Sequence, residues 1–491
     1  MTTDALIALV AVMMAVLLLI AIVAATAVGL LLWRRWRRNH PKEARAAKPT
    51  AAPAPGPGPA GTPVATMRRD APAPLSTETV PKGDAPADDE RILALGLEEP
   101  TSIEAVLRNL QTVKPLLKAE AAESDRIGRT TPLAGRALRA SGLYRWGFPA
   151  NRGGLGATYA ERLEAVTQIA RIDAGMAWVV HWISAHGELT RRLDDEAFAE
   201  LYPSTDLPTV FSATPLARAT LTEGGTIRID EAKWRLGSGG YHADRWLAGV
   251  KVWDAAGKPV IDETTEEQLF LGVWLPADKV RQADDWNPLG MRSTGSATYY
   301  LSEPIEIPRR WSFNAGAEVR PYFFPFMGVM TGAAQHLIDL TLETLRSKRA
   351  AGIAVGAHDM SRLTEAMASL DMLVFSLRGY AGYLDSVAAE RPSGVLTKAE
   401  LAWVHTVGMP VRSTVLNIRD VAADIYGTGF VSANSEFGRV LRDIQVALAH
   451  AWFRLSDTQA DRSWRVSLML DDPTIVPLWD ESWPFDHALE K

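Results

Sequence analysis

The chain divides into stretches with different patterns of hydrophobic and polar residues. Positions 5–33 are uncharged and almost entirely apolar. Residues 41–88 contain eleven prolines among alanine and glycine, with few large apolar side chains. From residue 89 to the end, apolar and polar positions alternate with the periods typical of folded elements. The pattern therefore predicts an apolar segment, a linker and a folded body.

Within the body, the spacing of apolar residues changes twice. Residues 100–200 show helical spacing, first at Ile103, Val106, Leu107, Leu110 and Val113 and again from Ala160 to Leu189. Four short β-rich runs follow, namely Pro208–Phe211, Thr226–Ile229, Leu269–Leu275 and Thr298–Leu301. Helical spacing returns at 325–390 and 395–470, with a break at Pro392-Ser393-Gly394. We therefore predict an α+β protein with a helical domain at 89–207, a β-domain at 208–314 and a helical domain at 315–491.

The apolar segment is long enough to cross a membrane. From Ala5 to Trp33 it reaches about 40 Å as a helix, against a hydrocarbon core of about 30 Å. Asp4 is the only charged side chain before it, whereas seven Lys or Arg lie between residues 34 and 50. A secretory signal peptide would carry its positive charges first. A buried helix of a soluble domain is the alternative interpretation.

The positive-inside rule then predicts the topology of the chain. Residues 1–40 form one transmembrane helix with a basic flank, and residues 41–88 form a disordered Pro/Ala-rich linker. The N-terminus lies outside the cell, and the enzyme body lies in the cytoplasm. The expected location is the cell membrane, with a single pass.

Composition narrows the chemistry of the body. The 491 residues contain no Cys, which excludes disulfides, thiol nucleophiles and iron–sulfur clusters. The net charge is −6, and the segment 34–50 alone contributes +6, so the rest of the chain is acidic and does not favour nucleic-acid binding. His181 and His186 are five residues apart and do not share a helix face, so no metal site is predicted.

Four motifs, in order, resemble segments of the acyl-CoA dehydrogenase superfamily. They are Leu143–Pro149 with Gly153, Gly154 and Gly156; Trp234 with Ser238-Gly239; Trp286 with Gly290–Ser296 and Ile307-Pro308; and Tyr426–Gly429 with Arg439, Arg442 and Asp443. They are similar to the flavin-dependent monooxygenase branch, which includes the oxygenase component of 4-hydroxyphenylacetate 3-hydroxylase and dibenzothiophene monooxygenase. The resemblance covers some 300 residues. It implies an N-terminal helical domain, a middle β-barrel, a C-terminal four-helix bundle, flavin between barrel and bundle, and a homotetramer.

The two branches of this superfamily need different residues. A dehydrogenase needs a carboxylate base, and the position that the resemblance indicates, five residues before Arg439, is Asn434. Glu436 and Asp424 lie nearby but out of register, so a dehydrogenase with a displaced carboxylate stays open as an alternative. A monooxygenase needs a donor near flavin C4a and N5, and the family's His, seven residues after the Asp of this motif, corresponds to His450.

The resemblance also implies roles for other residues. Ser238, Ser212 and Thr214 would contact the isoalloxazine, with Ser238 also catalytic beside His450. Arg349 would pair with the flavin pyrophosphate of a neighbouring subunit, and Gly427 and Thr428 would lie near the adenosine half of FAD. Trp178, His181 and Asn434 would line the substrate pocket. Thr428 replaces a family glycine and Asp424 a glutamine, which leaves both FAD and FMN open as the cofactor.

We therefore expect a membrane-tethered two-component monooxygenase that uses reduced flavin and O₂ on a small organic substrate, with an aromatic one as an option. The sequence has no Gly-rich loop for NAD(P)H in a strand–turn–helix context, so a partner flavin reductase would supply the reduced flavin. An acyl-CoA dehydrogenase and an inactive membrane-anchored scaffold remain the alternatives.

Overall fold

The computed structural model describes residues 85–453, except 264, 316–320, 322, 392–394 and 433, and also residues 466–471. They belong to the second of two compact units, Ala73–Lys491. The predicted transmembrane helix lies outside the described residues, as does most of the predicted linker. Helix α2, Ala85–Leu93, begins within the last residues of that linker. In the described part of the chain, no helix combines the length and apolarity needed to span a bilayer.

Helices precede the strands in the chain. They are α3 (Ile103–Ile127), α4 (Pro132–Ala140), α5 (Tyr159–Ala170), α6 (Ala174–Glu188) and α7 (Asp195–Leu201). The Ser102 side chain caps α3 by accepting the Ala105 N–H, and α3 ends at Gly128 in the left-handed conformation. The predicted apolar stripe of α3 is buried. This segment therefore folds as its helical spacing predicts.

The single long pattern from Ala160 to Leu189 forms two helices. Its break lies at Asp173, whose side chain accepts the Met176 N–H at 2.8 Å and caps α6. The first N–H groups of a helix have no partner within the helix, and a capping carboxylate supplies one. The cap therefore favours a new helix at this point over continuation of α5. The break turns α6 so that it packs against both α5 and strand β1.

All nine described strands lie between Thr209 and Asn314. They are β1 (Thr209–Leu221), β2 (Thr226–Ile229), β3 (Lys233–Trp234), β4 (Arg245–Trp253), β5 (Phe270–Leu275), β6 (Val280–Gln282), β7 (Tyr299–Leu301), β8 (Ile305–Pro308) and β9 (Ser312–Asn314). One sheet has the order β8-β2-β1-β4-β5-β9 and the other β3-β7-β6. The β1–β4 pair is parallel and the other pairs are antiparallel. The α+β class is confirmed, with the strands in two curled sheets.

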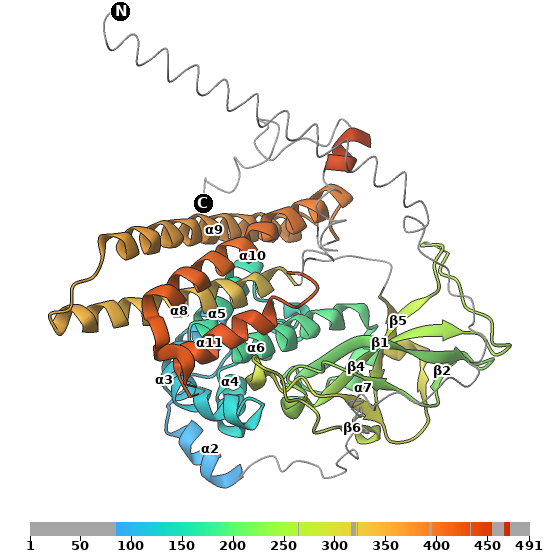
Figure 1. Ribbon diagram of the computed structural model, residues 1–491. Helices are drawn as coiled ribbons and strands as arrows, with labels where there is room; N and C mark the ends of the chain where they lie inside the picture. The colour runs from blue at the N-terminus through green and yellow to red at the C-terminus, as the bar shows by residue number, and fades with distance from the viewer. Residues whose placement is uncertain are drawn as a thin grey trace, which may run out of the picture. The chain divides into compact units, whose positions relative to one another are not determined.

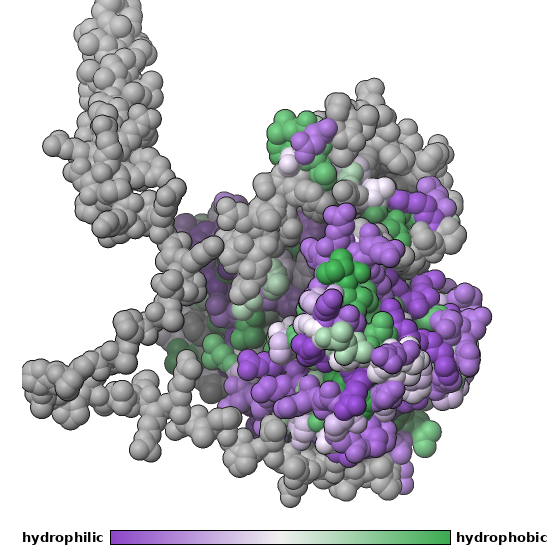
Figure 2. Space-filling model, turned by 90° about the vertical axis from the view of Figure 1, so that its right-hand side faces the viewer, coloured by the Kyte–Doolittle hydropathy of each residue, from purple (hydrophilic) through white to green (hydrophobic). Residues whose placement is uncertain are grey.

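Strand β4 is central and was absent from the predicted strand runs. It pairs with β1 on one side and β5 on the other, and most of its residues on both faces are buried. A strand buried on both faces lacks the alternation that marks a half-exposed strand. Seen from the side of the sheets, the surface is mainly hydrophilic with apolar side chains interspersed (Figure 2).

The last helices are α8 (Met327–Ala350), α9 (Ala357–Glu390), α10 (Lys398–Tyr426) and α11 (Glu436–Ala447). They share one hydrophobic core with α3–α6. Close approach of α8 to α5 depends on Gly332, where an added Cβ would lie 2.3 Å from the Thr167 carbonyl oxygen. In Figure 1 the helices lie together and the strands lie to one side. Helices α6 and α11 are thereby in contact.

Candidate active site

An aromatic cluster lies between α6 and the chain that follows α11. We define it as Trp178, His181 and Trp182 of α6, Phe326, and His450. The Trp178 ring packs edge-on against Phe326 at 4.5 Å and His450 at 5.3 Å between ring centroids. Phe326 lies 5.1 Å from His450 and 5.3 Å from His181. The structure therefore brings together three of the predicted site residues, Trp178, His181 and His450.

His450 is held by the turn that ends α11. Its backbone N–H donates to the Ala447 carbonyl oxygen at 3.0 Å, and its own carbonyl accepts from Phe453 N–H at 2.9 Å. Its Nδ1 accepts the Trp452 N–H at 3.4 Å. An acceptor at Nδ1 leaves the proton of a neutral imidazole on Nε2, which makes Nε2 a donor. The half-buried ring is thus arranged to donate a hydrogen bond beside Trp178 and Phe326.

Ser238 joins the same cluster through Trp178. The indole Nε1–H of Trp178 donates to Ser238 Oγ at 3.1 Å, and Ser238 Oγ lies 2.7 Å from Ser296 Oγ. The next residue, Gly239, has φ +79°, and an added Cβ would lie 3.0 Å from Val179 of α6. Glycine therefore lets the loop approach the helix. The two predicted catalytic residues, Ser238 and His450, therefore contact the same tryptophan.

Ser212 and Thr214 lie where β1 leaves its pairing with β4. The register shifts between Ser212 and Ala217, and the intervening Ala213 packs against Gly249, where an added Cβ would lie 2.6 Å from the Ala213 Cβ. The Ser212 hydroxyl donates to the Arg235 carbonyl and accepts the Thr214 N–H at 3.2 Å. Thr214 is exposed. The hydroxyl of Ser212 thus holds β1 at this register shift, while Thr214 is accessible.

Two histidines of α6 are buried and neutral. Burial, and then the charge of Arg162, lower the pKa of His181 well below its usual value. Burial lowers the pKa of His186 to about 4, although the Thr209 carbonyl accepts from its Nδ1 at 3.0 Å. Nε2 of His181 has no hydrogen-bond partner among the described residues. A buried polar atom without a partner is costly, so this atom marks a place where a bound molecule would supply one.

Two of the sequence motifs interlock behind the cluster. The Met291 N–H donates to the Asp443 carboxylate at 2.5 Å, and an added Cβ at Gly290 would lie 2.2 Å from the Arg442 carbonyl oxygen. Burial, and then the negative charge of Asp173, raise the pKa of Asp443 well above its usual value. These contacts fix α11, and with it His450, against the loop that carries Ser296.

The remaining predicted residues lie at the other end of α11. Arg349 is exposed at the end of α8, and Gly427 and Thr428 follow the end of α10. The two helix ends are tied by Lys348 Nζ, which donates to the Ile425 carbonyl at 3.1 Å. Asn434 is exposed and lines a separate surface cavity of about 790 Å³ with residues of α3 and the 288–292 loop. Helix α11 has 12 residues, about 18 Å, so these residues are apart from His450.

Both candidate carboxylate bases have partners: Glu436 is hydrogen-bonded to a histidine, and Asp424 forms an ion pair. His336 Nε2 lies 3.1 Å from Glu436 Oε1, and that hydrogen bond lowers the pKa of Glu436. Asp424 is exposed and lies 2.7 Å from Arg362. Neither carboxylate reaches the aromatic cluster. A carboxylate held charged by a partner is a weak base.

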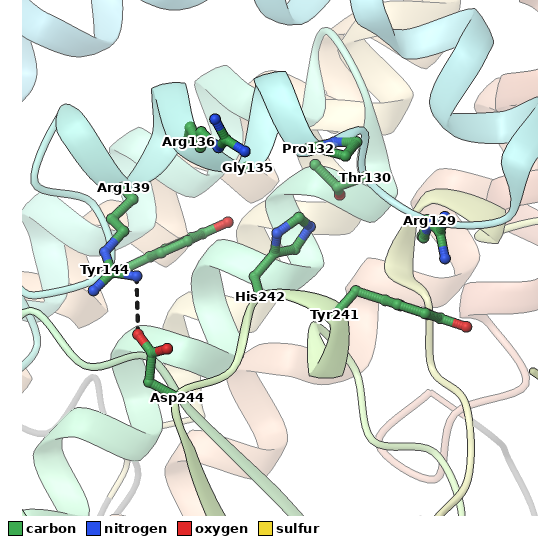
Figure 3. Close-up of a pocket in the computed structure, with 10 residues that line it drawn as sticks. All are labelled: Arg129, Thr130, Pro132, Gly135, Arg136, Arg139, Tyr144, Tyr241, His242 and Asp244. Atoms are coloured by element: carbon green, nitrogen blue, oxygen red, sulfur yellow. Dashed lines mark ion pairs between the residues drawn. The ribbon is translucent and has the colours of Figure 1, made fainter. Parts of the chain in front are cut away.

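A second cavity, of about 150 Å³, lies between α4 and the start of β4 (Figure 3). Tyr144 directs its hydroxyl into it, toward His242. Its arginines are engaged: Arg139 lies 2.9 Å from Asp244, and Arg136 lies 3.1 Å from Asp89. This cavity shares no lining residue with the aromatic cluster.

Sequence reasoning missed several residues of the site. Phe326 and Trp182 were not assigned to it, and Ser296 and Thr294 were noted only as part of a motif. The signal for Ser296 was present, because it follows the glycine of the motif whose first residues contact α11. The contact of Ser296 with Ser238, 58 residues away, depends on the tertiary structure.

Comparison with known proteins places this geometry in context. No protein-family profile matches the chain. The oxygenase subunit HsaA of a flavin-dependent monooxygenase from Rhodococcus jostii (strain RHA1) is 27% identical over 212 residues, 43% of this chain and 52% of that protein. The oxygenase component of FADH₂-dependent resorcinol hydroxylase from Rhizobium sp. (strain MTP-10005) is 29% identical over 199 residues, 40% and 46% of the two chains. The chain thus spans about half the length of the curated relatives it matches.

Superpositions on solved structures cover more of the chain than the sequence alignments do. XiaF from Streptomyces sp., solved with FADH₂ and glycerol, superposes with a TM-score of 0.66 at 20% identity, over 80% of this chain and 98% of that one. Dibenzothiophene monooxygenase TdsC from Paenibacillus sp. A11-2 superposes with a TM-score of 0.63 at 19% identity, over 74% and 97%. The chain therefore has the acyl-CoA dehydrogenase-like fold, and the two curated relatives above are named as oxygenase components of flavin-dependent enzymes.

Proposed function

We propose that this chain is the oxygenase component of a two-component flavin-dependent monooxygenase acting on a small aromatic substrate. The observation that carries the proposal is that Ser238 and His450 both contact Trp178. Its relatives named for resorcinol hydroxylation and indole-3-acetate oxygenation support an aromatic substrate class. The partly exposed ring of Trp182, which packs on the buried ring of Phe326, offers an apolar, polarisable contact surface for such a molecule.

The residues of the site fit a flavin. Ser238 offers a hydroxyl after β3, Thr214 is accessible at the register shift of β1, and His181 carries an unsatisfied buried nitrogen. Reduced flavin, supplied by a partner reductase, would provide the reaction with O₂ when bound. His450 would donate from Nε2 at the reacting centre, and the surrounding aromatic rings would exclude water. Either FMN or FAD satisfies this part of the site.

The dehydrogenase alternative receives less support. It needs a carboxylate near the flavin whose pKa suits proton abstraction. Glu436 is paired with His336 at the opposite end of α11, and its pKa is lowered. The preserved arrangement of Ser238 and His450 also disfavours an inactive scaffold.

We further propose that a second copy of the chain completes the cofactor site. Arg349, Gly427 and Thr428 are at least partly exposed at the end of α11 away from His450, so a flavin bound in the same chain's cluster would not need them. Helix α9 presents an apolar stripe with Met372 74% and Phe375 72% exposed. Continuing the stripe, Gly379 has no described atom within 4 Å of a Cβ position, which leaves room for close approach of a partner helix.

Oligomer formation is tested with two charged variants of the full chain in detergent. Met372→Glu with Phe375→Glu should reduce the mass measured by light scattering to that of a monomer. Ser369→Glu, an exposed change beside the stripe, should leave the mass unchanged. An unaltered oligomer in the double variant would contradict the α9 interface.

We propose, finally, that residues 1–40 anchor the enzyme in the cell membrane, with the body in the cytoplasm. The support is the uncharged segment from Ala5 to Trp33 and the basic residues after it. Since the chain has no Cys, single-cysteine labelling is unambiguous. In intact spheroplasts, a membrane-impermeant maleimide should label Thr3→Cys but not Ser361→Cys. The reverse pattern, or a chain that leaves the membrane fraction at high pH, would contradict the anchor.

The catalytic proposal is tested with the full chain, chemically reduced FMN or FAD and a panel of phenols and indoles. Under ¹⁸O₂, product should carry one ¹⁸O atom, and oxidised flavin with acyl-CoA should give no reduction. Flavin reduction by an acyl-CoA without O₂ would instead establish the dehydrogenase. Failure to bind flavin in either redox state would overturn both enzyme proposals.

A further inference from the structure

Three hydroxyl groups form an unbroken hydrogen-bonded chain from the aromatic cluster into the protein. Trp178 Nε1–H donates to Ser238 Oγ at 3.1 Å, and Ser238 Oγ lies 2.7 Å from Ser296 Oγ. Ser296 Oγ lies 2.7 Å from Thr294 Oγ1, and Thr294 Oγ1 donates to the Met291 carbonyl oxygen at 2.8 Å. The chain thus begins at a group that can only donate and ends at one that can only accept.

The donor at one end and the acceptor at the other determine which hydroxyl donates in each hydrogen bond between them. Each hydroxyl has one proton, and the carbonyl of Met291 can only receive one. Thr294 therefore gives its proton to Met291 and accepts from Ser296. Because Ser296 donates its only proton to Thr294, it must accept the hydrogen bond from Ser238. This is the one assignment that makes all four hydrogen bonds.

Burial makes any other assignment costly. Thr294 is 2% exposed and Ser296 is 6% exposed, so water does not replace a lost bond readily. If Ser238 turned its proton toward a ligand, either the Ser238–Ser296 or the Ser296–Thr294 bond would be lost. The remaining lone pair of Ser238 Oγ therefore meets a ligand as an acceptor.

We propose that Thr294 and Ser296 are positioning residues that make Ser238 an acceptor-only hydroxyl, so that the site prefers reduced over oxidised flavin. The inference rests on the proposed function. Reduced flavin carries a proton on N5 and donates there, whereas N5 of oxidised flavin only accepts. With N5 bound at Ser238, an acceptor there would pair with the N5–H of reduced flavin and would face a second acceptor in oxidised flavin.

The test measures binding and redox potential, without turnover. For the full-length protein, the ratio of oxidised to reduced flavin Kd is determined anaerobically, together with the two-electron potential of bound flavin. Thr294→Val and Ser296→Ala each free a proton for Ser238 to redirect, so the preference for reduced flavin should fall about tenfold, the size of one hydrogen bond. A tenfold change lowers the potential by about 30 mV.

Matched variants separate positioning from folding. Thr294→Ser keeps the hydroxyl and should keep the wild-type potential. Thr341→Val removes a buried hydroxyl that donates to the Leu337 carbonyl, outside the site, and should leave the potential unchanged. In a Ser238→Ala background, Thr294→Val should have no further effect on the ratio.

Three outcomes would overturn the inference. They are an unchanged potential in Thr294→Val, equal weakening of both redox states, or the same shift of Thr294→Val in the Ser238→Ala background. In each of these cases flavin still binds, so the proposed function stands. Absence of flavin binding by the wild-type chain would instead refute the proposed function itself.

Discussion

The two ends of helix α11 present opposite chemical environments. At its C-terminal end, His450 packs against the rings of Trp178 and Phe326. At its N-terminal end, Glu436 is paired with His336 and lies 3.8 Å from Arg439. The first environment is aromatic and partly buried, and the second brings Glu436 and Arg439 close together.

The histidines show what this difference does. His186 and His181, near the aromatic end, are buried and have pKa values lowered by burial. His336 is equally buried but is paired with a carboxylate. The same residue type thus lies among aromatic rings at one end of the helix and is hydrogen-bonded to a carboxylate at the other. Of the two candidate carboxylate bases, Glu436 lies at the end of α11 that lacks the aromatic cluster.

The largest expected effect comes from removing the donor at the aromatic end. His450→Ala should lower product formation by about 10²–10⁴-fold, because a positioned proton donor is lost. Reduced flavin should bind with unchanged Kd, and O₂ should be converted to hydrogen peroxide. Product and peroxide are measured together in one assay. A variant that keeps full product yield per flavin consumed would remove His450 from the mechanism.

Because His186 is buried and neutral, we expect the folded state to lose stability in acid. The pKa of His186 is about 4 in the folded chain and about 6.5 when unfolded, so its contribution is fully present above pH 6.5. As the pH falls from 6.5 to 4, the unfolded state binds the proton first, and the free energy of unfolding should drop by about 3 kcal/mol. His186→Asn keeps a donor for the Thr209 carbonyl but does not titrate. Denaturant unfolding at several pH values should show a smaller loss in this variant; equal losses would contradict the assignment.

A smaller effect is expected where the loop at Gly290 packs against α11 at Arg442. In Gly290→Ala the new Cβ would meet the Arg442 backbone at 2.2 Å, and the chain must shift, at a cost of about 1–3 kcal/mol. Gly224→Ala is the control, since its nearest atom is the Thr222 hydroxyl at 3.7 Å. Thermal or denaturant unfolding compares the two. Equal stability of both variants would mean that the loop does not lock α11.

The smallest expected effect lies at the charged end. Glu436→Gln should leave hydroxylation within about twofold and cost less than about 1 kcal/mol, because the carboxylate is partly exposed to water. The pKa of Glu436 is lowered, so its stabilisation is present above about pH 4.3 and is lost as the pH falls through the folded pKa. The stability difference between wild type and variant should therefore vanish in acid. A large loss of activity at neutral pH would revive the dehydrogenase.

The local pattern of apolar residues predicted most of the helices and strands. It failed for a strand that is buried on both faces and for a helix boundary that is set by a capping side chain. The stripe from Val106 to Val113 became the buried face of α3. Strand β4 was missed because both of its faces are covered. The helix boundary at Asp173 was missed because the apolar spacing continues through it. The Asp173 side chain accepts the Met176 N–H and so starts a new helix there.

The sequence by itself determined the order of helices and strands, the motifs that resemble the acyl-CoA dehydrogenase superfamily, and His450 and Ser238 as candidates. Those properties depend on spacing and residue type along the chain. Only the tertiary structure decided which candidates meet. It joined Ser238 to Trp178, 60 residues away, and Met291 to Asp443, 152 residues away, and it left Asn434 and Arg349 away from His450. Contacts at such separations depend on how helices and strands pack, which no local pattern encodes.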